Sequence, residues 1–186
     1  MTMRTHLLTP LFVLVACASI SGTQTFEANR QFTLPSVAAV GGDIGSRTIT
    51  AVGATNELSF AESVLDDVDQ LRERDHIDSA EAEVRVVSVR LSTDTTFAGV
   101  TAVRVQLVTG EQTVELCSRT LSAEEQKASS ISCETDHVMD EATLQQTTSG
   151  ASAQIGAQLD VSGGVTATKL NSVVTFKVEV NVDASL

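Results

Sequence analysis

The densest group of polar side chains in the sequence lies between residues 134 and 141. It contains four carboxylates and one imidazole within eight residues, at Glu134, Asp136, His137, Asp140 and Glu141. Such side chains can bind a divalent cation, because hard cations need several oxygen ligands. However, the spacing and the glycine of an EF-hand are missing, and the chain has no paired-histidine motif of a metalloprotease. We therefore expect a solvated acidic loop and no metal centre, with these five residues as weak candidate ligands.

Two histidines are candidate general bases. His76 stands between Asp75 and Asp78, and His137 lies in the acidic segment just described. A histidine beside a carboxylate can accept a proton near neutral pH, but a histidine at a helix exit is also favoured by the helix dipole. No serine occupies a Gly-x-Ser-x-Gly elbow. We assign no catalytic residues, and a secreted or surface-held hydrolase using His76 or His137 is the alternative.

The N-terminal residues 1–16 are typical of an export signal. Arg4 provides the positive start, and a short apolar run follows from Leu7 to Ala16. A membrane-spanning helix needs about 20 apolar residues, whereas this run is shorter and contains Pro10. The pattern therefore predicts a signal peptide that is removed.

The end of this signal, Leu14-Val15-Ala16-Cys17, resembles the lipobox of bacterial lipoproteins. The resemblance covers only the first 20 or so residues. It implies cleavage before Cys17 and a lipid bilayer as partner, with covalent diacylglycerol and an N-acyl chain on Cys17 and no other cofactor. Because Ala18 follows the cysteine, it also implies sorting to the outer membrane. Ala16 and Ala18 also satisfy the small-x-small rule of ordinary secretion, so a soluble periplasmic or secreted chain starting at Ser19 is the alternative.

The two other cysteines fit an exported protein. Cys117 and Cys133 remain as an even pair in a compartment where disulfides persist. A bridge between them would close a loop of about 16 residues, worth about 3 kcal/mol in the chain-entropy model. We expect this disulfide, and two buried free thiols are the alternative.

Composition limits the partners. The formal net charge is −12, so the basic surface that nucleic acid requires is missing. The chain has six Phe but no Trp and no Tyr, which disfavours carbohydrate recognition by stacking. The unknown partner is therefore expected to be a protein or an apolar ligand. After a lipidated cysteine and polar tether at 17–25, residues 26–186 are predicted to form a single β-rich domain.

Strand periodicity dominates that domain. Apolar and polar residues alternate over 173–183, and a hairpin is expected over 100–118 around Gly110. The strand at 83–92 changes phase near Val86 and Val87, which indicates either a β-bulge or burial of both faces. Further strands are predicted at 30–34, 46–52 and 165–170.

Helical signals are fewer. A capping pair, Ser59 and Glu62, begins an amphipathic pattern that we end near Arg74. A second pair, Ser122 and Glu125, predicts a short helix between the two cysteines. Residues 140–148 form a weaker helix candidate, and 147–156 is either a loop or an edge strand.

These patterns together predict a mainly β protein. We expect an antiparallel β-sandwich of immunoglobulin-like architecture, with one amphipathic helix and one or two short helices; a partly open β-barrel or an α+β fold is the alternative. The function expected is that of an envelope lipoprotein, not an enzyme, with a binding or structural domain. A carrier of an apolar ligand is a further alternative, since Val-rich sandwiches can open an apolar cleft.

Overall fold

The computed structural model describes most of the chain from Ala18 onward. The described residues are 18–34, 47–54, 67–71, 73–74, 77–109, 112–139 and 154–184. Within them the chain forms eight strands: β1 (Ala18–Thr33), β2 (Arg47–Ala54), β3 (Ile77–Thr93), β4 (Val100–Thr109), β5 (Gln112–Thr120), β6 (Ser130–Val138), β7 (Gln154–Val161) and β8 (Lys169–Ala184). Residues 67–71 are helical, and a 3-10 helix, η1, spans Glu125–Lys127.

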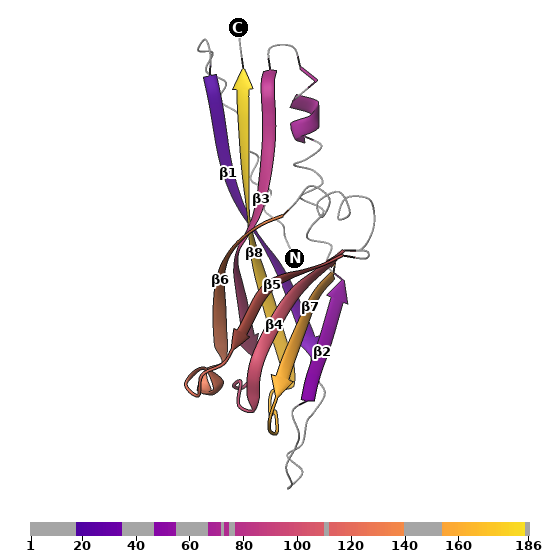
Figure 1. The fold of residues 1–186 in the computed structure, drawn as a ribbon, viewed down its shortest axis with the longest axis vertical. Helices are drawn as coiled ribbons and strands as arrows, with labels where there is room; N and C mark the ends of the chain where they lie inside the picture. Colours follow the sequence, from indigo (N-terminus) through magenta and orange to yellow (C-terminus); the bar gives the residue numbers. More distant parts are fainter. Residues whose placement is uncertain are drawn as a thin grey trace, which may run out of the picture.

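The strands form two four-stranded sheets that face each other (Figure 1). The long sheet has the order β1-β8-β3-β6, and the short sheet has the order β2-β7-β4-β5. All of the neighbouring strands are antiparallel. The predicted β-sandwich is therefore confirmed.

The strand order follows from the way the chain is wound. β4 pairs with β5, β3 with β6, β2 with β7 and β1 with β8, as in one long hairpin folded at the β4–β5 turn. Successive pairs of this hairpin alternate between the two sheets, which is the arrangement of a jelly roll. The connectivity thus differs from that of an immunoglobulin domain, in which the first strand lies beside the second.

The core fills the space between the sheets. Along β8 the alternate residues Leu170, Val174 and Phe176 are completely buried. They face equally buried side chains of the short sheet, among them Leu107 and Ile155. The apolar half of each alternating pattern therefore closes the sandwich, and the polar half forms its two outer faces.

The strongest strand predictions are confirmed. β8 includes the alternating segment 173–183, and β4 and β5 form the hairpin expected over 100–118, although its turn at 110–111 lies outside the described residues. The phase change in β3 is a bulge, since its pairing shifts between Val86 and Ser88 against both neighbouring strands. Val86 is fully buried, whereas Val87 is only partly so.

The first strand corrects one boundary. Residues 18–25 were expected to belong to a polar tether, but they pair with β8 along the first half of β1. The expected strand at 30–34 is only the end of this longer strand. The first half of β1 lacks the apolar alternation that predicts a strand. Its residues lie at the edge of a sheet, where few side chains are buried.

Three further segments also differ from expectation. The supposed acidic loop begins inside a strand, because Glu134–Val138 belongs to β6. Of the stretch 147–156 that was expected as a loop or edge strand, residues 154–156 belong to β7, which lies between β2 and β4, and the rest lies outside the described residues. β7 contains Gly156 and Ala157, whose small side chains weaken the strand signal. Residues 165–168 are not a strand but the approach to β8.

The helical predictions are described only in part. Residues 67–71 are helical and bury Val68, but the capping pair Ser59 and Glu62 lies outside the described residues, as does the candidate helix at 140–148. The second capping pair, Ser122 and Glu125, lies at the start of a single 3-10 turn, η1, which confirms a short helix between the cysteines.

The long sheet extends well beyond the short one (Figure 1). β6 pairs with β3 only from Arg85 onward, so the part of the sheet beyond it contains β1, β8 and β3. We call this part the stalk, made of residues 18–24, 77–84 and 178–184. Ala18 and Ala184 pair at its far end.

Candidate functional site

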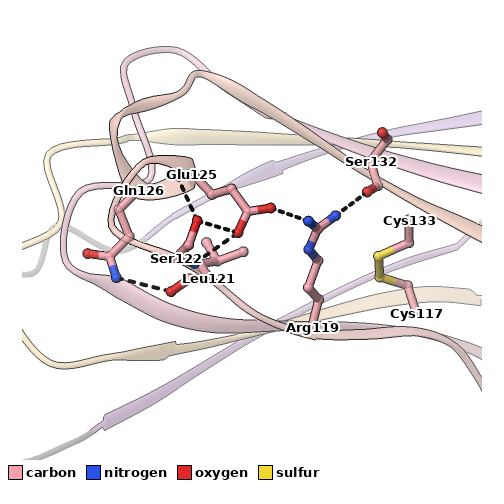
Figure 2. A network of polar contacts seen from close by, with 8 residues as sticks. All are labelled: Cys117, Arg119, Leu121, Ser122, Glu125, Gln126, Ser132 and Cys133. Carbon is pink, nitrogen blue, oxygen red and sulfur yellow. Dashed lines mark hydrogen bonds and ion pairs between the residues drawn. A yellow bond between two sulfur atoms is a disulfide. The ribbon is translucent and has the colours of Figure 1, made fainter.

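Cys117 and Cys133 form a disulfide that joins the two sheets (Figure 2). Cys117 lies on β5, at one edge of the short sheet, and Cys133 lies on β6, at the corresponding edge of the long sheet. Their Cα atoms are 6.1 Å apart, within the range usual for disulfides. The bridge therefore closes one open side of the sandwich.

A polar network supports the same side (Figure 2). The Arg119 guanidinium donates to the carbonyl oxygen of Ser132 on β6 at 2.7 Å and pairs with Glu125, the first residue of η1. The Ser122 amide and hydroxyl both donate to Glu125 Oε2 at 2.8 Å, and the Glu125 amide donates back to Ser122 Oγ at 3.3 Å. This is the reciprocal capping that the sequence predicted.

The same contacts stabilise the charge of Glu125. The hydrogen bonds from the Ser122 amide and hydroxyl, together with the Arg119 cation, lower the pKa of the Glu125 carboxyl. Each contact orders the connection between β5 and β6, so we interpret this network as structural.

In its described part, the acidic segment divides its side chains between the two faces of β6. Asp136 pairs with Arg85 on the outer face of the long sheet, with nitrogen–oxygen distances of 2.9 and 3.1 Å. His137 lies opposite the buried Val86, so that it is on the inner face of the strand. Asp140 and Glu141 lie outside the described residues, and within the described ranges no three His, Cys, Asp or Glu side chains are grouped as metal ligands.

Ion pairs cover the outer face where the stalk begins. Arg85 contacts Glu83 as well as Asp136, and these hydrogen bonds, that from Glu83 first, raise the pKa of the Arg85 guanidinium. On β8, Lys177 pairs with Glu179, and its hydrogen bond lowers the pKa of that carboxyl. Because these charges are paired with one another and exposed to solvent, they form a hydrated face with little free charge.

A different feature lies on the same outer face at the end away from the stalk. There the long sheet carries a hollow of about 520 Å³, lined by Asn29, Gln31, Ser92, Thr93, Asp94, Lys169 and Asn171. Every lining side chain is polar. These residues come from β1, β3, β8 and the loop after β3, and we call this feature the polar hollow.

Asp94 forms one wall of the polar hollow. Its carboxylate accepts hydrogen bonds from the amides of Thr168 at 2.9 Å and Lys169 at 3.2 Å, and from the Thr168 hydroxyl. These bonds, with the hydroxyl of Thr168 first, lower the pKa of the Asp94 carboxyl. Asp94 therefore stays ionised and ties the loop after β3 to the start of β8.

The sequence analysis did not identify the polar hollow. Its residues are widely separated along the chain, and they converge only because β1, β8 and β3 are neighbours in the long sheet. A polar face was predictable for the alternating strand at 173–183. The register that places Gln31 opposite Asn171 could not be derived from that pattern.

Two other predicted sites lie outside the described residues. Cys17, the expected lipid attachment site, immediately precedes the first described residue, and His76 falls in a gap before β3. Within the described part of the chain, no helix is long and apolar enough to cross a membrane.

The strand order and the bridge between the sheets define a disulfide-linked jelly-roll sandwich. No family model and no curated protein matches the sequence. Among solved structures, the chain is similar to one described as the structure of infectious bursal disease virus Gx strain, at 9% identity and a TM-score of 0.20. The match covers 98% of this chain but only 46% of the viral chain. At that score the likeness carries no argument about fold or function.

Proposed function

We propose that this chain is a bacterial envelope lipoprotein, held on the outer membrane by acyl chains on Cys17, with a sandwich that acts as a non-enzymatic binding or structural module. The observation that supports it best is the position of β1. This strand begins at Ala18, one residue after the lipobox-like cysteine, and pairs with β8 along its whole length. Acyl chains on Cys17 would thus be joined to a paired sheet with no flexible linker between them.

The length of β1 adds to this argument. Its 16 residues span about 50 Å at the usual rise of a strand. The loops at 94–99, 121–129 and 162–168 all lie at the opposite end of the sandwich from Ala18. An anchor at Cys17 would therefore present these loops and the polar hollow at a distance of ~40 Å from the lipid surface.

A binding or structural role agrees with what is gathered at that far end. Loops supported by a rigid sheet are where proteins commonly recognise partners. Here the sheet is reinforced by the disulfide and by the Arg119–Glu125 network. The stalk would act as a spacer, and the far end would meet the partner.

Metabolic labelling tests the anchor. The full-length gene is expressed in a bacterium supplied with an alkyne fatty acid, and the product is followed by label, membrane fractionation and intact mass. We expect the unaltered protein to be labelled, membrane-bound and to start at Cys17, and Cys17→Ala to be unlabelled. The matched control is the double variant Cys117→Ala/Cys133→Ala, which keeps Cys17 and should remain labelled. An unaltered protein that is unlabelled, soluble and starts at Ser19 would refute the proposal.

A further inference from the structure

We infer that the polar hollow binds a neutral glycan, recognised through hydrogen bonds from Gln31, Asn171 and Ser92. This inference goes beyond the proposed function and does not depend on lipidation of Cys17. It rests on the register of three neighbouring strands, on the charge of the hollow and on the chemistry of its lining.

The register places three hydrogen-bonding side chains in one row. Gln31 on β1 is directly opposite Asn171 on β8, and Asn171 is directly opposite Ser92 on β3. The buried Phe32, Leu170 and Leu91 are their chain neighbours, so the row lies on the outer face. Adjacent strands are about 4.8 Å apart, which spreads the row over about 10 Å.

The chemistry of this row matches sugar hydroxyls. A side-chain amide offers donors and an acceptor close together, and a serine hydroxyl can do both. The hydroxyls of a sugar likewise donate and accept, so paired hydrogen bonds can form along the row. Asn29 on β1 lines the same hollow and places a further side-chain amide beside this row.

The charge of the hollow favours a neutral ligand. The whole chain has a formal net charge of −12, yet the lining contains one cation, Lys169, and one anion, Asp94. The Asp94 carboxylate is already occupied by hydrogen bonds from Thr168 and Lys169. A phosphate would meet a single lysine beside a carboxylate, and a cation would meet a carboxylate whose oxygens are engaged. A neutral polyhydroxylated molecule is neither repelled by the Asp94 carboxylate nor dependent on its oxygens as ligands.

The lining also predicts the form of the ligand. It includes no aromatic ring, so the stacking energy on which sugar sites commonly depend is missing. Hydrogen bonds that replace bonds to water contribute little each. We therefore expect weak binding of single sugars. Retention on polymers should be measurable, because a protein that dissociates from one sugar unit can rebind to a neighbouring unit.

Affinity electrophoresis tests the inference. The full chain, purified in a non-ionic detergent, is run in native gels that contain dextran, mannan, hydroxyethyl cellulose or glycol chitin, with alginate as an acidic polymer. We expect at least one neutral polymer to retard the protein. The variant Gln31→Ala/Asn171→Ala should lose at least tenfold in apparent affinity for that polymer.

The matched control keeps residue types and strands constant. Gln24→Ala/Asn181→Ala removes one glutamine from β1 and one asparagine from β8 at exposed positions in the stalk. We expect its affinity to stay within twofold of the unaltered protein, with both variants giving the same circular-dichroism melting curve. Retardation by no neutral polymer, by alginate alone, or equally in both variants would overturn the inference. Because lipidation is not measured here, this result is separate from that of the fatty-acid labelling.

Discussion

At the scale of single residues, Asp94 connects two loops that are far apart in sequence. It follows β3, and its carboxylate accepts two amide protons and one hydroxyl proton from the segment that leads into β8. The residue was not singled out from the sequence, because its partners Thr168 and Lys169 lie more than seventy residues away. Ser122 and Glu125, by contrast, were predicted as a capping pair, since their contact spans a single turn.

The lowered pKa of Asp94 predicts a dependence of stability on pH. In the folded protein its pKa is below the ordinary value of 3.8, so its ionised form stabilises the fold above about pH 4. This contribution is lost as the pH falls through the folded-state pKa. We expect the melting temperature to fall on acidification from pH 5 to pH 3, and to fall less steeply for Asp94→Asn, which cannot titrate.

Circular-dichroism melting at half-unit pH intervals measures this effect. Some acid sensitivity should remain in Asp94→Asn, because the pKa values of Glu125 and Glu179 are also lowered. Superimposable pH profiles for the variant and the unaltered protein would show that Asp94 does not contribute in this way.

At the scale of elements, the loop after β3 and the loop after β7 touch through glycines. Gly99 has a φ of +81°, and a Cβ at this position would lie 2.6 Å from the carbonyl oxygen of Gly164. The Ser162 amide also donates to the Gly99 carbonyl at 2.9 Å. The close approach of backbone to backbone explains why this loop needs a residue without a side chain.

We therefore predict that Gly99→Ala destabilises the protein by about 2–3 kcal/mol, through strain at positive φ and the clash with Gly164. Urea unfolding followed by circular dichroism measures the free energy of unfolding. The matched control is Gly22→Ala on β1, where a Cβ would meet no atom within 4 Å. Its effect should stay within about 0.5 kcal/mol, and equal losses in the two variants would contradict the prediction.

The elements that the sequence analysis missed share a physical cause. β6 is rich in polar residues and β7 contains Gly156 and Ala157, so neither carries the series of β-branched apolar residues typical of β8. Each is a strand because a neighbouring strand supplies its hydrogen bonds: β3 for β6, and β2 and β4 for β7. Tertiary pairing here overrides local propensity.

At the scale of the whole molecule, the disulfide joins the two sheets covalently, beside the hydrogen bond from Arg119 on β5 to Ser132 on β6. Cys117 and Cys133 are 16 residues apart, and the chain between them crosses from the short sheet to the long one. Most of the stabilisation by such a bridge is ascribed to a restricted unfolded chain.

We predict that Cys117→Ala/Cys133→Ala lowers the free energy of unfolding by about 3 kcal/mol, as expected for a loop of this length. Urea unfolding with and without reductant measures the loss. Reductant should destabilise the unaltered protein by a similar amount and leave the double variant unchanged. A response of the double variant to reductant would mean that the effect arises elsewhere.

The sequence by itself determined the features that depend on near neighbours. The alternation along β8, the phase change at Val86 and Val87, the β4–β5 hairpin, the capping at Ser122 and the general sandwich architecture all follow from spacing within a few residues. Only the tertiary structure decided the jelly-roll order, the length of β1 and the position of the polar hollow. These depend on which strands pair across more than a hundred residues, as β1 does with β8, and a period of two residues has the same pattern whichever partner lies beside it.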